Sequence, residues 1–107
     1  MNNLVISTAQ FENRSGDKDY NLSVIEKLTK EAKGKGADVV SFHECSVTGY
    51  TFAKNLSKSE MLQLAEYIPE GESVQRLISI ANENDITILA GLFEKDESDN
   101  LFNTYVC

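Results

Sequence analysis

The segment from Phe42 to Tyr50 gathers most of the side chains in this sequence that can do chemistry. It reads Phe-His-Glu-Cys-Ser-Val-Thr-Gly-Tyr and so brings a histidine, a glutamate, a cysteine and a tyrosine into one short run. A carboxylate partly removed from water at the end of a strand is suited to accept a proton near neutral pH. Glu44 is therefore a candidate general base, and the alternative is an ordinary carboxylate that caps the following loop.

The neighbours of Glu44 in the chain do not form a site of their own. Successive side chains of a strand point to opposite faces, so His43 and Cys45 are expected to point away from Glu44 unless the strand has already broken there. A zinc site is not expected, because His43 is the only histidine and structural zinc takes Cys or His ligands from separate segments. A Cys-His nucleophile pair would lack a further group to orient its base. Cys45, like Cys107, is expected to be a small buried residue.

Tyr50 follows a predicted turn and has two interpretations. Thr48-Gly49-Tyr50 has the composition of a turn in which glycine supplies a backbone conformation that other residues adopt only with strain. In one interpretation the tyrosine and the residues after it pack over this turn, and in the other Tyr50 lines the mouth of a pocket. As a site residue, Tyr50 is the candidate for substrate binding.

A β-α-β unit is predicted to position Glu44. A short apolar run over residues 4–10 is typical of a strand, and the polar stretch over 12–19 is typical of a loop. Apolar residues recur at helical spacing over 20–33, ahead of glycines that favour a helix end, and residues 39–42 form a second strand. The strands of such a unit run parallel. Glu44 then falls beyond the carboxyl end of the second strand, where ligands bind in parallel α/β sheets.

The remaining sequence repeats this alternation. Ser57 and Glu60 have the spacing of a capping box, which predicts a short helix that ends before Pro69. The later elements are a helix over 74–81 that closes in 82–85, a strand over 86–93, a polar hairpin turn over 95–100 and a returning antiparallel strand over 101–107. The predicted fold is α/β, in the order βαβαββ, with a mostly parallel sheet of about four strands. If the long helices cover one face, the other, apolar face is left uncovered.

Size and charge limit the classes of function. The chain has 107 residues and a mass of 11.9 kDa, enough for one compact domain. Its net charge of -7 has the wrong sign for nucleic acid or an anionic membrane surface, so neither is an expected partner. The N-terminus lacks a basic leader, and no apolar run approaches the ~20 residues of a membrane span, so a cytoplasmic location is expected.

The order of these segments resembles the nitrilase superfamily of carbon-nitrogen hydrolases. The likeness extends over the whole chain: an opening strand, a helix, Gly-Ala-Asp-Val-Val-Ser-Phe-His-Glu over 36–44, the Thr-Gly-Tyr loop, Ser-Val-Gln-Arg-Leu over 73–77, Ile-Leu-Ala-Gly-Leu over 88–92 and Phe-Asn-Thr over 102–104. No single motif is decisive, but their order and spacing together are specific. One departure is His43, where the family more usually has proline.

The resemblance implies a fold and a reaction. Members of the family are αββα sandwiches that hydrolyse nitriles, amides or carbamoyl compounds with a Glu, Lys and Cys set, in which Glu44 matches the general base. The lysine and the nucleophilic cysteine would lie beyond Cys107. Residues 1–107 would then be the N-terminal part of a carbon-nitrogen hydrolase domain, inactive alone, acting on a small molecule without metal or cofactor. The likeness also implies a homo-oligomer, formed through the uncovered sheet face.

Two other classes of function stay open. A flavodoxin-like binding or signalling domain would have helices on both faces of the sheet. Residues 7–10, however, offer neither the acidic residues of a phospho-receiver nor a glycine-rich phosphate loop. A fragment without activity could instead serve as an assembly module through its apolar sheet face.

Overall fold

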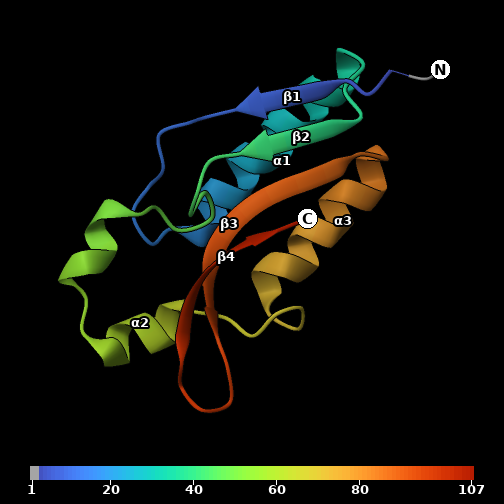
Figure 1. Ribbon diagram of the computed structural model, residues 1–107. Helices are drawn as coiled ribbons and strands as arrows, with labels where there is room; N and C mark the ends of the chain where they lie inside the picture. Colours follow the sequence, from blue (N-terminus) through green and yellow to red (C-terminus); the bar gives the residue numbers. More distant parts are fainter. Residues whose placement is uncertain (1–2) are drawn as a thin grey trace.

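The computed structural model describes residues 3–107, which form a four-stranded sheet with helices packed on it (Figure 1). The elements are β1 (Ile6–Ala9), α1 (Lys18–Gly34), β2 (Val39–Phe42), the 3-10 helix η1 (Thr51–Asn55), α2 (Lys58–Leu64), α3 (Glu72–Asn84), β3 (Thr87–Lys95) and β4 (Leu101–Val106). The strands lie in the order β1-β2-β3-β4, the first three parallel and β4 antiparallel to β3. The predicted α/β fold with a mostly parallel sheet is confirmed.

The first β-α-β unit forms as the apolar pattern predicts. Asp17 caps α1 by accepting a hydrogen bond from the backbone N–H of Tyr20 at 3.0 Å, which satisfies a donor that the helix itself leaves free. α1 buries Leu22 and Ile25 in the same apolar cluster as Val40 of β2. This packing joins helix to sheet and fixes the direction in which β2 runs toward Glu44.

The second helical region begins with the predicted capping box. Ser57 Oγ accepts from the backbone N–H of Glu60 at 3.1 Å, and the Glu60 carboxylate accepts from the backbone N–H of Ser57 at 3.0 Å. α3 then buries Val74 and Leu77 in the main core. The 3-10 helix η1 lies directly after the predicted turn over 48–50, in a stretch where no helix is predicted, so the connection from β2 to α2 is more ordered than its sequence indicates.

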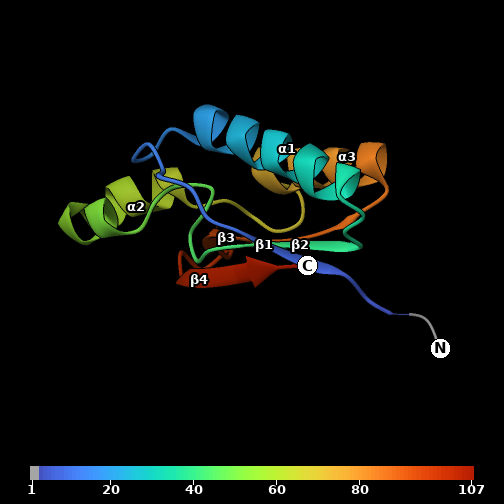
Figure 2. The ribbon, with the colours of Figure 1, turned by 90° about the horizontal axis from the view of Figure 1, so that it is seen from above.

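The two long helices lie on one side of the sheet. Figure 2 shows α1 and α3 together above the strands, with neither on the opposite face. The open face carries Ile6, Thr8, Ser41, Leu89 and Tyr105. Ser41, Leu89 and Tyr105 alternate along their strands with residues that pack against the helices, and Thr8 and Ile6 lie in register with open-face residues of β2. The open face is apolar only in part, since the hydroxyl groups of Thr8 and Ser41 lie among its apolar side chains. The helices on both faces that a flavodoxin-like domain needs are not found in residues 3–107.

A partly buried carboxylate ties the loop before α3 to the start of α1. Glu66 Oε2 accepts a hydrogen bond from Lys18 Nζ at 2.7 Å, and Glu66 Oε1 accepts one from the backbone N–H of Ser73 at 2.8 Å. Ser73 Oγ also donates to this carboxylate. Burial alone would raise the pKa of Glu66, but the hydrogen bonds from Lys18 and Ser73 outweigh it and hold the pKa below its usual value.

We expect Glu66→Gln to lower the free energy of unfolding near neutral pH by about 2 kcal/mol, the scale of hydrogen bonds to a charged group. Because the folded pKa of Glu66 lies below its ordinary value of 4.5, the contribution is present above about pH 4.5 and is lost as the pH falls through the folded pKa. Urea unfolding of both proteins should show their difference shrinking in acid. Glu70→Gln, at an exposed position nearby, should change neither the free energy of unfolding nor its dependence on pH. A difference that stays constant into acid would contradict this account.

Candidate active site

Glu44 lies just beyond the carboxyl end of β2, where the chain leaves the sheet. β2 ends at Phe42. The Glu44 carboxylate is exposed, so the expectation of partial burial is wrong for residues 3–107. The side chain is nevertheless held, because Asn103 of β4 donates a hydrogen bond from Nδ2 to Glu44 Oε1 at 2.6 Å. β4, which is separated from β2 by β3, thus orients the carboxylate while water still reaches it.

Cys45 occupies a strained position directly after Glu44. Its φ of 53° lies in the left-handed region, which costs a residue with a Cβ about 1–2 kcal/mol. The side chain is fully buried, as expected. Its Sγ donates to Asn103 Oδ1 at 3.4 Å. The strand has already ended here, which is the exception to the expectation that Cys45 and Glu44 point apart, and both side chains reach Asn103.

The turn after Glu44 rests directly on β3 at Gly91. Ser46 Oγ accepts a hydrogen bond from the Gly91 N–H at 3.1 Å, and the Val47 N–H donates to the Gly91 carbonyl at 3.0 Å. A Cβ at residue 91 would lie 2.4 Å from the backbone nitrogen of Cys45. Glycine is therefore needed for this close approach of two backbones. A glycine inside an apolar strand is the sequence signal for such an approach.

His43 supports the turn through its contacts with Asn13 and Phe11. Its Nε2 lies 2.7 Å from Asn13 Oδ1, and its ring meets the Phe11 ring edge to face at 5.1 Å between centroids. Asn13 Nδ2 in turn donates to the Ser46 carbonyl at 2.5 Å. Burial lowers the pKa of His43, which favours the neutral ring. His43 therefore packs and hydrogen-bonds, and takes no part in the contacts around Glu44.

β4 brings two side chains to the end of β2. Asn103 contacts Glu44 and Cys45, and the Tyr105 hydroxyl donates to the Phe42 carbonyl. The Tyr105 hydroxyl also lies 2.9 Å from Ser41 Oγ, so β4 is tied to β2 across β3. The sequence predicts β4 as a strand, but no periodicity or spacing indicates that these two residues contact the Glu44 segment.

Tyr50 lies beside a pocket and does not cover the turn. The ring of Phe52 lies 3.7 Å from where a Cβ on Gly49 would stand, and Gly49 has the predicted positive φ, 85°. Phe52 is therefore the cover of this turn. Tyr50 is 61% exposed and, with Lys54 and Phe93, lines a pocket of about 400 Å³. This position fits the pocket-mouth interpretation of Tyr50.

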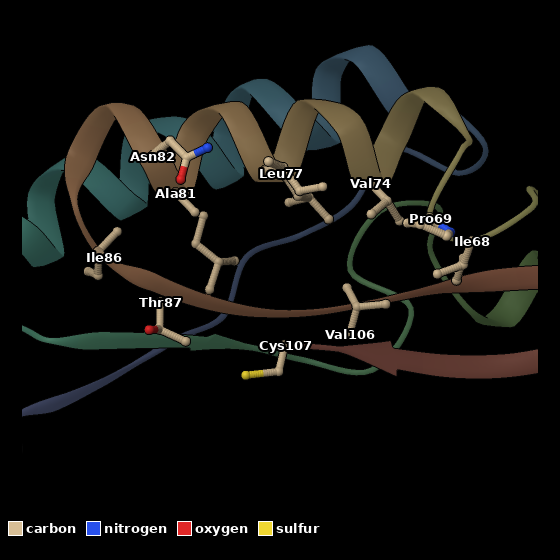
Figure 3. Close-up of a pocket in the computed structure, with 12 residues that line it drawn as sticks. Ile68, Pro69, Val74, Leu77, Ala81, Asn82, Ile86, Thr87, Val106 and Cys107 are labelled. Carbon is tan, nitrogen blue, oxygen red and sulfur yellow. The ribbon is translucent and has the colours of Figure 1, made fainter.

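A larger hollow of about 560 Å³ lies between α3 and the ends of β3 and β4 (Figure 3). Its walls include Val74, Leu77 and Val106, and no carboxylate, histidine or lysine lines it among the described residues. Cys107 lies at its edge and is exposed. The expectation that Cys107 is buried is wrong, because β4 ends one residue earlier. This hollow offers no acid-base chemistry.

Metal clusters and membrane spans are not found in residues 3–107. No three His, Cys, Asp or Glu side chains in this range gather closely enough to hold a metal ion. None of the helices described there has the length and apolar character needed to cross a membrane.

We expect Cys45 to be unreactive toward thiol reagents in the folded chain, while the exposed Cys107 reacts. Burial, with a smaller contribution from the charge of Glu44, raises the pKa of Cys45 to about 11. At about pH 8 roughly one such thiol in a thousand is then ionised. Titration with a chromogenic disulfide should find one fast thiol in the folded chain and two in urea. Cys107→Ser should have no fast thiol, and a fast reaction in that variant would contradict the burial of Cys45.

These features define a class of α/β protein that holds a carboxylate just beyond the carboxyl end of a parallel strand, with its long helices on one face of the sheet. The carbon-nitrogen hydrolase family matches residues 5–107, and the chain belongs to that family. The resemblance seen in the sequence is thereby confirmed.

Two curated relatives show how much of such a protein this chain represents. The chain is 41% identical to a nitrilase of Pyrococcus abyssi over 88 residues, which are 82% of this chain and 32% of that protein. It is 37% identical to an omega-amidase of Xenopus tropicalis over 87 residues, which are 81% of this chain and 29% of that protein. The chain therefore spans about a third of the length of these relatives.

Solved structures show the same fold. A CN-hydrolase superfamily protein of Xanthomonas campestris, solved with an arsenic adduct in its active site, superimposes with a TM-score of 0.78 at 23% identity, over 98% of this chain and 36% of that one. The NitFhit protein of C. elegans gives a TM-score of 0.76 at 24% identity, over 94% of this chain and 24% of that one. The predicted nitrilase-type architecture is confirmed.

Proposed function

We propose that residues 1–107 are the N-terminal part of a carbon-nitrogen hydrolase domain in which Glu44 is the general base. The observation that carries the proposal is the hydrogen bond of 2.6 Å from Asn103 to Glu44 Oε1, in a chain of this family. A carboxylate fixed at a strand end and open to solvent can accept a proton from a group placed against it. The substrate is a small nitrile, amide or carbamoyl compound.

The proposed reaction uses groups that this chain does not supply. Glu44 takes the proton of a cysteine thiol, the thiolate attacks the substrate carbon, and a lysine ammonium stabilises the negative charge that develops. An amide adduct expels its amine, which takes the proton from Glu44 and leaves a thioester, whereas a nitrile adduct takes that proton on nitrogen and becomes a thioimidate. Water then hydrolyses either intermediate. Cys45 is unsuited to be that nucleophile, because it is buried and its pKa is raised to about 11. The lysine and cysteine come from sequence beyond Cys107, so the chain alone is inactive.

The proposed function is tested by comparing hydrolysis by the 107-residue chain with hydrolysis by a longer protein from the same reading frame. Release of ammonia from a panel of small nitriles, primary amides and N-carbamoyl compounds is measured with the 107-residue chain and with the longest product of its reading frame. We expect the chain alone to match a protein-free blank and the longer product to hydrolyse at least one class. A longer product that has the lysine and cysteine but hydrolyses none of them would contradict the proposal. Tyr50, at the pocket of about 400 Å³, is the proposed substrate-binding residue.

We also propose that the chain forms a homo-oligomer in the cytoplasm through the open face of the sheet. Ile6 is 57% exposed and Tyr105 is 46% exposed on that face, and hydroxyl groups beside them can pair across an interface. Ile6→Lys is expected to reduce the mass seen by light scattering to that of one chain. Ile78→Lys, at 43% exposure on α3, where it lines the larger hollow on the side of the sheet that the helices cover, is the control and should leave the mass unchanged. A single-chain mass for the unaltered protein would contradict the proposal.

A further inference from the structure

We propose that Asn103 is a positioning residue for Glu44, and that the buried thiol of Cys45 holds the Asn103 amide in the one orientation this requires. The proposal rests on the proposed role of Glu44 and extends it to the last strand of the sheet. Its geometry is a chain of two hydrogen bonds, from Cys45 Sγ to Asn103 Oδ1 at 3.4 Å and from Asn103 Nδ2 to Glu44 Oε1 at 2.6 Å.

The chemistry of the three groups fixes the direction of both bonds. An ionised carboxylate only accepts hydrogen bonds, so the amide must turn its Nδ2 toward Glu44. Its Oδ1 then faces the sulfur of Cys45, where a protonated thiol is the donor. Burial raises the pKa of Cys45 to about 11, so the thiol keeps its proton at neutral pH. A cysteine unsuited to be a nucleophile is therefore suited to lock this amide.

β4 is anchored at Asn103 and at the two residues that follow it. The backbone of Asn103 pairs with Phe93 of β3, and the next residue, Thr104, donates from Oγ1 to Glu94 at 2.7 Å. Tyr105 donates to the carbonyl of Phe42 at the end of β2. The amide is thus built on a fixed strand, and the Glu44 side chain, on a turn, takes its position from the amide.

One oxygen of the base stays available. Among the hydrogen bonds of residues 3–107, the Glu44 carboxylate is engaged through Oε1 by Asn103, which leaves Oε2 to receive a proton. An exposed glutamate without such a partner moves among several rotamers. A reacting group displaced by about 1 Å loses roughly 100-fold in rate. Asn103 therefore acts on the rate by holding Oε2 in one place.

The geometry is tested by NMR on the 107-residue chain, through the side-chain amide protons of Asn103. We expect one of them to be shifted downfield and slow to exchange, and to lose both properties in Glu44→Ala. Cys45→Ala should also speed the exchange, and Cys45→Ser should restore the slow rate because a hydroxyl can still donate. The Asn100 amide, bonded to Asp96 at 3.0 Å, is the internal control and should not respond. If the chemical shift and exchange rate of the Asn103 amide protons are unchanged in Glu44→Ala, the proposal is overturned.

The consequence for rate is tested in the longer product. Asn103→Leu is expected to lower kcat about 100-fold with little change in KM, because it removes positioning and not substrate contact. Backbone amide signals of β4 confirm that the variant is folded. Full kcat in Asn103→Leu, together with loss of activity in Glu44→Gln, overturns the positioning role and leaves the proposed function standing. Full activity in Glu44→Gln overturns the proposed function, while the NMR result still reports the geometry.

Discussion

Glu44→Gln in the longer product is expected to lower kcat by about 10²–10⁴-fold, the contribution of a positioned general base. Glutamine has the size of glutamate, and its carbonyl oxygen can still accept the hydrogen bond that Asn103 donates to Glu44 Oε1. The variant therefore keeps the geometry and loses only the ability to take a proton. Steady-state ammonia release on the best substrate of the panel gives kcat and KM for both proteins.

Glu97→Gln is the matched control for this substitution. Glu97 is an exposed carboxylate in the turn between β3 and β4, so its removal makes the same change in net charge away from the site. We expect wild-type kcat and KM from this control. Activity within a few-fold of wild type in Glu44→Gln would show that another group is the base.

Gly91→Ala is expected to destabilise the chain by about 1–3 kcal/mol, the range for forcing extra volume into a well-packed place. The new Cβ would stand 2.4 Å from the backbone nitrogen of Cys45 and 3.2 Å from the carbonyl carbon of Glu44. Backbone atoms cannot rotate away as a flexible side chain can, so the turn must lift from β3. We expect a lower urea midpoint, and the slow exchange of the Asn103 amide should be lost even where the chain is still folded.

Gly34→Ala provides the comparison at a glycine with free space. Gly34 is the last residue of α1, and a Cβ there would meet nothing within 4 Å. Alanine also has the higher helix propensity, so we expect the stability to be unchanged or raised by up to about 1 kcal/mol. Equal destabilisation by both substitutions would show that close packing of the turn on β3 is not the cause.

The apolar pattern predicts the elements around the site well. The strand predicted over 39–42 has the same bounds as β2. The helix predicted over 20–33 corresponds to α1, which begins two residues earlier and ends one residue later. These predictions succeed because burying an apolar stripe on one sheet face is a local property that period and spacing reveal. The placement of Glu44 beyond the end of β2 follows from the same reasoning.

The contacts of the site could not be predicted in this way. Alternation along a strand predicts that Glu44 and Cys45 point apart, and it fails because Cys45 adopts a positive φ on which the sequence gives no information. Asn103 lies far away in the chain, and only the tertiary pairing of β4 with β3 brings it to Glu44. Glu66 was not predicted either, since an isolated acidic residue gives no sign that it is buried against Lys18 and Ser73.

The contact that fixes Glu44 joins positions 59 apart in the chain. During synthesis Glu44 leaves the ribosome well before Asn103. The two residues meet only when the hairpin of β3 and β4 closes. A nascent chain halted at the hairpin turn would lack Asn103, so the hydrogen bond that fixes the Glu44 carboxylate could not yet form. The geometry that readies Glu44 to accept a proton is therefore set only after β4 has paired with β3.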